Sequence, residues 1–224
     1  MELHDTIRRR VMVRRFTEEA LEPETVRRLL DLALRAPTAG NSAGTAWVAL
    51  VGPRETEAYW SATTDAGWRG RNPELFEGLR RAPVVLLSYC SPAAYVARYA
   101  ETDKADPQLG SAAASWPVPY WHGDAAFGVM SVLLAAVDAG LGACVLGAFK
   151  GAKRLADVLA VPDGWELFCA VALGHPDREQ PRSRSLGRER PSGSARVHWG
   201  TWGPGSDRAG YDSMITTQSA TEAP

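Results

Sequence analysis

The sequence is poor in cysteine and carries no surplus of charge. Its 224 residues include three cysteines, Cys90, Cys144 and Cys169, each among apolar neighbours and without a Cys-x-x-Cys motif. These features exclude a disulfide framework and favour buried thiols in a reducing compartment. Lys and Arg number 25 against 26 Asp and Glu, so no overall field suggests nucleic acid or an anionic membrane as a partner. The charged N-terminus lacks a signal-peptide core, and we expect a cytoplasmic protein.

Patterns for metal binding and for side-chain catalysis are also missing. The four histidines are scattered, with no pair at helical ligand spacing, so we expect no metal site. Gly140-Leu141-Gly142 follows a helical pattern and has no third glycine at Rossmann spacing. Asp124 and Asp138 are too isolated to form a carboxylate pair. We therefore predict no catalytic side-chain set, as expected where a cofactor supplies the chemistry.

The apolar pattern predicts helices alternating with strands and one long helix late in the chain. Helices are expected at 2–10, 23–35, 54–65 and 153–159, and strands at 47–51, 83–89, 143–146 and 167–173. The unbroken apolar run at 83–89 is typical of a strand buried on both faces. Residues 120–139 are apolar all round, which favours a core or interface helix over a membrane span. The late long helix favours an α+β fold over a doubly wound sheet.

Other segments are expected to be irregular. Residues 68–73 are loop-like, and the Pro-rich and Gly-containing stretch 101–120 predicts an excursion or a lid. We expect one domain over residues 1–204. The small and polar residues of 205–224 predict a disordered tail.

Three motifs point to a polar, phosphorylated ligand. Arginines are concentrated at positions 8, 9, 10, 14 and 15. A guanidinium fork matches phosphate oxygens, although a surface cluster paired with Glu2, Asp5, Glu18 and Glu19 is the alternative. Ala36–Ser42 offers hydrogen bonds with little bulk, as a flat polar ligand needs. The strand after Gly142 would present the amides of Gly147 and Ala148. Arg188 and Arg190 are either a second phosphate arm or a basic surface loop.

In order and spacing these motifs resemble the FMN-dependent nitroreductase family, over about residues 7–202. The residues that carry the resemblance are Arg-Arg-x-x-x-Arg-Arg-Phe at 9–16, Ala-Pro-Thr-Ala-Gly-Asn-Ser at 36–42, Arg-Ala-Pro-Val at 81–84, Gly-Leu-Gly-Ala-Cys at 140–144 and Ala-Leu-Gly-His-Pro at 172–176. The closing segment 197–202 is similar to that of an actinobacterial-type branch.

The resemblance implies a nitroreductase-like fold, with a mixed, mainly antiparallel sheet flanked by helices. It also implies a homodimer with swapped termini and two FMN sites at its interface. Arg10, next to Val11 and Met12, would hold the FMN phosphate, and Arg14 would stabilise negative charge at the flavin N1/C2 edge. The amides of Gly147 and Ala148 would lie near N5 and O4. The remaining expected contacts are the partner subunit's Pro37, Thr38, Ala39 and Asn41, and the phosphate clamp of Arg188 and Arg190.

Three departures from the family pattern affect this expectation. Met12 stands where the family usually has Ser, Ala43 stands where Gln is frequent, and Arg188 and Arg190 are separated by one residue. The implied activity is ping-pong transfer of electrons from NAD(P)H to a small acceptor such as a nitroaromatic or a quinone. One alternative is an FMN-dependent tailoring dehydrogenase that oxidises azolines or peptide-derived rings. The other is a non-catalytic flavin-sequestering protein.

Overall fold

The computed structural model describes residues 1–180, 188, 196–200 and 202. The chain divides into two units, Met1–Pro181 and Arg182–Pro224, and each is described by itself. In the second unit the rings of His198 and Trp202 lie 4.3 Å apart, tilted by 31°. The predicted tail at 205–224 and the predicted ligand Arg190 lie outside the described residues.

The described part of the first unit is built on a four-stranded sheet in the order β1-β2-β4-β3. Its strands are β1 (Thr45–Val51), β2 (Val84–Cys90), β3 (Gly142–Leu146) and β4 (Glu166–Gly174). All three neighbouring pairs are antiparallel. A parallel contact exists as a single bridge, between Met12 and Ala143. Every residue of β2 is buried, which confirms the strand predicted from its unbroken apolar run.

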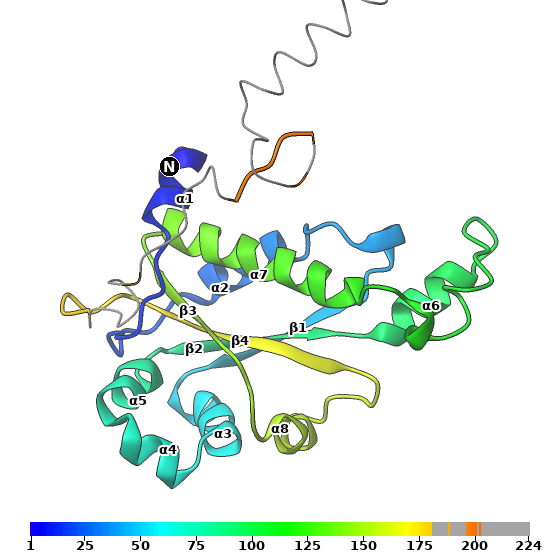
Figure 1. Ribbon diagram of the computed structural model, residues 1–224. Helices are drawn as coiled ribbons and strands as arrows, with labels where there is room; N and C mark the ends of the chain where they lie inside the picture. Colours follow the sequence, from blue (N-terminus) through cyan, green and yellow to red (C-terminus); the bar gives the residue numbers. More distant parts are fainter. Residues whose placement is uncertain (181–187, 189–195, 201, 203–224) are drawn as a thin grey trace, which may run out of the picture. The chain divides into compact units, whose positions relative to one another are not determined.

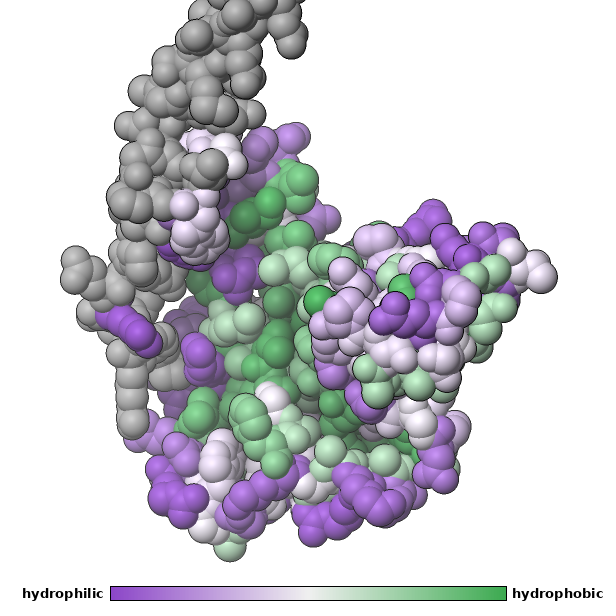
Figure 2. Space-filling model, turned by 45° about the vertical axis from the view of Figure 1, so that its right-hand side comes forward, coloured by the Kyte–Doolittle hydropathy of each residue, from purple (hydrophilic) through white to green (hydrophobic). Residues whose placement is uncertain are grey.

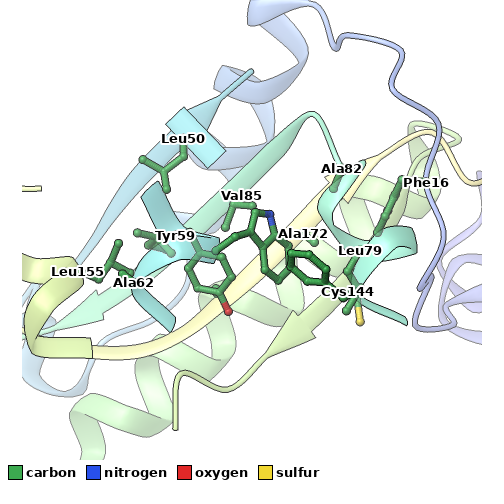
Figure 3. Close-up of a cluster of buried hydrophobic side chains, with 14 of the residues drawn as sticks. Phe16, Leu50, Tyr59, Ala62, Leu79, Ala82, Val85, Cys144, Leu155 and Ala172 are labelled. Carbon is green, nitrogen blue, oxygen red and sulfur yellow. The ribbon is translucent and has the colours of Figure 1, made fainter. Parts of the chain in front are cut away.

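Helices cover both faces of the sheet (Figure 1). On one face lie α2 (Pro23–Ala33) and α7 (Tyr120–Asp138), beside α1 (Leu3–Arg9). On the other face lie α3 (Pro53–Thr63), α5 (Pro73–Arg80) and α8 (Ala152–Val158). The core beneath α3 and α5 brings together Phe16, Leu79, Val85 and Ala172 among others (Figure 3). These layers give the α+β architecture that the sequence predicted.

The long helix α7 has the length and composition of a membrane span, but its contacts are those of a core helix. Eight of its 19 residues are buried. It packs against α1, α2 and all four strands. Because its hydrophobic residues already meet protein on this broad side, the prediction of a core or interface helix is the one that the packing supports.

The loop predicted at 68–73 is wrong, because α4 (Ala66–Arg71) occupies most of it. The carboxylate of Asp65 accepts a hydrogen bond from the Trp68 amide at 2.7 Å and so caps this short helix. Trp68 packs edge-on against Phe76, at 6.2 Å between ring centroids. Pro73 then begins α5, where its missing amide proton is not needed.

The excursion predicted at 101–120 is confirmed as turns and one 3-10 helix, η2 (Ala113–Ser115), which end where α7 begins. It follows α6 (Pro92–Ala100). Both α6 and η2 belong to a third hydrophobic cluster, centred on Tyr95, Trp116 and Trp121. Beside this cluster lies a second short 3-10 helix, η1 (Ala39–Asn41), which contacts α6 and α7.

Candidate functional site

A cavity of about 320 Å³ lies between the end of β3, the corner of α3 and α4, and one side of α5. Arg14 and Gly147, two of the predicted cofactor ligands, both line it. Its other walls are largely aromatic and aliphatic: Tyr59, Trp60, Trp68, Leu75, Leu79, Val145, Leu146 and Phe149. An apolar chamber with a few convergent polar groups is the usual form of a small-molecule site.

The segment that carries Arg14 is anchored along the free edge of β3. The Val13 amide donates to the Ala143 carbonyl at 3.0 Å, and Phe16 is fully buried. From the other side, Gln180 Oε1 accepts from the amides of Arg14 and Arg15, at 3.1 and 3.3 Å. Gln180 Nε2 also donates to the Arg15 carbonyl. These bonds fix the backbone from which the Arg14 side chain reaches the cavity.

The Arg14 guanidinium keeps its charge available. Its Nη1 donates to the Met12 carbonyl at 3.4 Å, and within the described ranges no carboxylate lies at ion-pair distance from it. Burial raises the pKa of the neighbouring Cys144 thiol, and the Arg14 charge opposes that rise. Arg14 therefore provides an unpaired cation at the cavity wall.

The alternative interpretation of the arginine cluster included ion pairs with Glu2, Asp5, Glu18 and Glu19, and none of these pairs occurs among the residues that the structure describes. Glu18 pairs with Arg81 at 3.9 Å, and Glu19 with His175 at 3.8 Å. Arg15 pairs with Glu179 at 3.9 Å. Arg8, Arg9 and Arg10 form no ion pair in the described part of the chain. Four members of the cluster, Arg8, Arg9, Arg10 and Arg14, thus remain free to meet an anion.

Met12 and Val11 have different surroundings. Met12 is half-buried and packs against the hydrophobic clusters on both faces of the sheet. Val11 is 64% exposed. Met12, at the position where the resemblance leads one to expect serine, therefore adds apolar contacts to both clusters that a hydroxyl would not provide.

The loop after β3 is tied to the α3–α4 corner. Lys150 Nζ lies 3.1 Å from Asp65 Oδ2, and Arg154 donates to the carbonyls of Ser61 and Ala62. Among the described residues, the amides of Gly147 and Ala148 donate to no backbone carbonyl. Ala148 does not line the cavity, whereas Gly147 does. One end of the cavity thus offers a free amide beside an anchored loop.

Two titratable groups of the cavity lining, Tyr59 and Cys144, are neutral at neutral pH. Burial raises the pKa of Tyr59 to about 12, and the pKa of Cys144 is raised as well. Arg71 and Lys150 line the rim with Arg14, against one carboxylate, Asp65. A ligand would meet a weakly hydrated, positively charged chamber, which suits an anionic or electron-accepting ring.

The structure does not bring Pro37, Thr38, Ala39 and Asn41 to this cavity. They form a separate tight turn around η1, near α6 (Figure 1). Within the turn, Thr38 Oγ1 accepts from the Ala43 amide at 3.2 Å. Pro37 and Asn41 are exposed. A single chain therefore presents the predicted ligands in two separate places.

Sequence reasoning missed the side chains that hold this turn. The buried Asp124 carboxylate accepts from the Ala39 amide and from the Tyr95 hydroxyl, each at 2.7 Å. Arg98 Nε donates to the Gly40 carbonyl at 2.8 Å. The available signal was an isolated Asp in the first turns of a helix that is otherwise apolar.

The predicted second phosphate arm is not tested. Arg188 is an exposed residue of the second unit, and Arg190 lies beyond the described residues. The phosphate clamp stays a prediction.

One group of potential metal ligands exists in the described part of the chain. Cys90, His122 and Glu166 have donor atoms within 4.8 Å of one another, and His122 Nε2 lies 3.1 Å from Glu166 Oε2. Burial, and secondarily Glu166, raise the pKa of Cys90 to about 12. Because a metal takes the thiolate, this burial opposes binding, and we assign no ion to the group.

The chain belongs to the nitroreductase family, whose model matches residues 7–175. This range contains the cavity, the arginine segment and the turn around η1. The predicted family membership and the predicted fold are therefore confirmed.

Individual relatives are distant. A protein of Archaeoglobus fulgidus, provisionally named an NADH dehydrogenase/NAD(P)H nitroreductase, is 24% identical over 193 residues, covering 85% of this chain and 92% of its own. A solved nitroreductase, also provisionally named, from Desulfovibrio desulfuricans in complex with FMN is 24% identical, with a TM-score of 0.60 over 86% of this chain and 98% of that one.

A variant of an FMN- and NADPH-dependent nitroreductase from Sphigopyxis sp. strain HMH has the same fold. It is 21% identical, with a TM-score of 0.65 over 90% of this chain and 100% of that one. At these identities the solved structures establish the fold alone.

Proposed function

We propose that this protein is an FMN-dependent oxidoreductase that passes electrons from NAD(P)H to a small acceptor such as a nitroaromatic or a quinone. The observation that carries the proposal is the cavity in which the unpaired Arg14 cation and the free Gly147 amide converge between aromatic walls. Family membership and the FMN complex of a relative add support.

The residues present fit a flavin. A flat, electron-poor ring needs apolar walls, a hydrogen-bond donor near its reactive edge and positive charge where the reduced ring becomes anionic. Trp60, Leu75 and Leu146 provide walls, Gly147 provides the donor and Arg14 provides the charge. When bound, FMN would supply hydride transfer in two half-reactions, first with NAD(P)H and then with the acceptor. Arg10 would hold its phosphate, with Arg188 and Arg190 as a second arm.

We propose that the second group of ligands comes from a second copy of the chain in a homodimer with swapped termini. On α7, Phe127 and Met130 are 53% and 47% exposed, and on α1, Leu3 and Ile7 are more than half exposed. Figure 2 shows a band of apolar residues down the middle of one face, with hydrophilic residues on both sides. Burying such a surface favours association. The partner's Pro37, Thr38, Ala39 and Asn41 would complete the flavin site, in the cytoplasm, with no nucleic acid or membrane as partner.

The decisive experiment is a visible spectrum of the purified protein with FMN, followed by anaerobic addition of NADH or NADPH. We expect a bound-flavin spectrum that bleaches with the nicotinamide and recovers with menadione or a nitroaromatic. A bound flavin that stays oxidised would instead favour the sequestering protein or the tailoring dehydrogenase. Absence of FMN binding would overturn the proposal altogether.

Arg14→Ala tests the assigned charge. We expect FMN to dissociate at least about tenfold more readily, or to be reduced at least about tenfold more slowly, since a hydrogen bond to a charged group contributes about 1.5–3 kcal/mol. Arg27→Ala, at an exposed side chain of α2 that pairs with Glu24, is the matched control and should change neither quantity. Equal behaviour of the two variants would remove Arg14 from the site.

Met130→Asp tests the dimer. Placing a charge on the apolar side of α7 should shift sedimentation from dimer to monomer and release FMN. Val158→Asp is the control, because Val158 is 63% exposed but lies on α8, across the sheet. A Met130→Asp protein that stays dimeric would place the interface elsewhere.

A further inference from the structure

We infer that Asp124, together with Tyr95 and Arg98, is a positioning group that holds the Ala39–Ser42 turn in the conformation that meets FMN. The inference rests on the proposed function for its link to FMN. Its structural part, the control of the turn by a buried carboxylate, stands on the geometry of this chain alone.

The Asp124 carboxylate is buried, so hydrogen bonds must offset the free energy that its removal from water costs. Its residue is 5% exposed, in the middle of the cluster of Tyr95, Trp116 and Trp121. Oδ2 accepts two short bonds of 2.7 Å, one from the Ala39 amide and one from the Tyr95 hydroxyl. Burial of a carboxylate is costly unless such donors compensate. The backbone of the turn is therefore one of the groups that satisfy the buried carboxyl oxygen.

Tyr95, the second hydrogen-bond donor to Asp124, is also held firmly in place. Tyr95 is fully buried and packs edge-on against Trp116 and Trp121, at 5.9 and 6.0 Å. Burial and then the hydrogen bond to Asp124 raise the pKa of the phenol, so it stays protonated and keeps donating. The tyrosine and the turn thus share one acceptor atom.

Arg98 holds the next residue of the turn. Its Nε donates to the Gly40 carbonyl at 2.8 Å, while Asp103 grips the guanidinium through two bonds of 2.6 Å. The ring of Tyr99 lies against Gly40, so that a Cβ at this position would come within 2.7 Å of it. The end of α6 therefore holds the turn from outside, with Asp103 of the excursion supporting Arg98, and no described residue of the excursion lines the cavity.

The turn needs this support because its backbone is strained. Gly40 has φ +64°, and the non-glycine residues Asn41 and Ala43 have φ +56° and +50°. Glycine adopts such angles freely, whereas left-handed conformations of non-glycine residues such as Asn41 and Ala43 persist only where the surroundings determine them. With the Ala39 amide and the Gly40 carbonyl taken by the network, the exposed Pro37 and Asn41 are what the turn can offer to a second molecule.

The test compares Tyr95→Phe and Asp124→Asn with Tyr89→Phe. Tyr89 is also a buried tyrosine, at 2% exposure, but its hydroxyl has no partner in the described structure. The first readout is hydrogen–deuterium exchange of residues 37–44 in the protein without FMN. We expect exchange to accelerate about tenfold or more in the two network variants and to stay unchanged in Tyr89→Phe.

The second readout is FMN affinity of the same proteins, with the dimer fraction measured alongside. We expect a loss of about tenfold or more in the network variants that still fold and dimerise. Unchanged exchange in both variants would overturn the positioning role. Faster exchange with unchanged FMN affinity would overturn its link to the cofactor. If the wild type binds no FMN, the proposed function fails, and exchange alone decides the role of Asp124; if Asp124→Asn does not fold, Tyr95→Phe decides.

Discussion

The cavity beside Arg14 and the turn around η1 are two parts of one predicted site, yet they are held in different ways. The cavity is walled by large side chains that pack against one another, such as Trp60 between Tyr59 and Phe76. The turn is held by directional bonds to Asp124 and Arg98. Packing spreads its free energy over many atoms, whereas the turn depends on a few donors and acceptors. We therefore expect the cavity wall to be destabilised by truncation of a large side chain. The turn should be released by removal of a single hydrogen-bonding atom.

The largest expected effect is on the packed wall. Trp60→Ala removes a side chain that is 2% exposed and should lower the free energy of unfolding by about 3–5 kcal/mol. Phe149→Ala alters an aromatic residue of the same cavity that is 97% exposed, and should change stability by less than about 0.5 kcal/mol. Urea unfolding measures both. Similar losses of unfolding free energy in the two variants would mean that burial does not determine how much a wall residue contributes to stability.

A smaller effect separates strain from contact in the turn. Gly40→Ala introduces a Cβ at a left-handed residue and against Tyr99, and should cost about 2–3 kcal/mol. Gly140→Ala, just after the end of α7, is also at a left-handed residue, at φ +72°, but a Cβ there meets nothing within 4 Å, so it should cost only about 1–2 kcal/mol. Chemical denaturation of the two variants isolates the contribution of the Tyr99 contact. Equal losses of unfolding free energy in the two variants would show that the contact with Tyr99 does not restrict residue 40.

The cap of α4 should give a modest, pH-dependent effect. The Trp68 amide, and then Lys150, lower the pKa of Asp65 below its ordinary 3.8. A carboxyl with a lowered pKa stabilises the fold above its ordinary value and loses that contribution as the pH falls through its folded value. Wild type should therefore melt above Asp65→Asn at pH 7, and the gap should close below about pH 3.8. A difference in melting temperature that does not change with pH would contradict an origin in the lowered pKa of Asp65. Asp163→Asn, at an exposed turn, is the control and should show no such pH dependence.

The smallest expected effect concerns the three cysteines, which should not react with a thiol reagent in the native protein. Burial raises the pKa values of Cys90 and Cys169 to about 12, and Cys144 is also buried. Because the thiolate is the reactive form, the native protein at pH 8 should leave all three thiols unmodified by a disulfide reagent. The same protein in denaturant should react at each. Rapid labelling of one thiol in the native protein would show that the core around it opens.

Long apolar segments made much of the fold predictable. Every residue of the strand at Val84–Cys90 is buried, and the helix at Tyr120–Asp138 buries one broad side, as their apolar sequences predict. Short elements were harder: α4 has six residues, less than two turns, and depends on a cap from Asp65 that composition does not reveal. Local pattern carries no information on such long-range or single-atom contacts.

The same limit applies to the candidate site. The motifs located Arg14 and Gly147, which the structure brings to one cavity although they are far apart in the chain. They did not reveal Asp124, because its role exists only once η1 and α7 meet across 85 residues. A lone acidic residue in an apolar helix could be noticed in the sequence, but the groups that donate hydrogen bonds to it could not be named.

Part of the cavity wall is held by Gln180, which is synthesised long after the segment that it binds. The amides of Arg14 and Arg15 are pinned by a side chain 165 or more residues later, after the last strand, β4, has ended at Gly174. A nascent chain leaving the ribosome can assemble the four strands before this glutamine arrives. The bonds to the amides of Arg14 and Arg15 can thus form only after β4, and a chain that stops shortly after β4 would keep its sheet and the Val13–Ala143 bond but lose the bonds to Gln180.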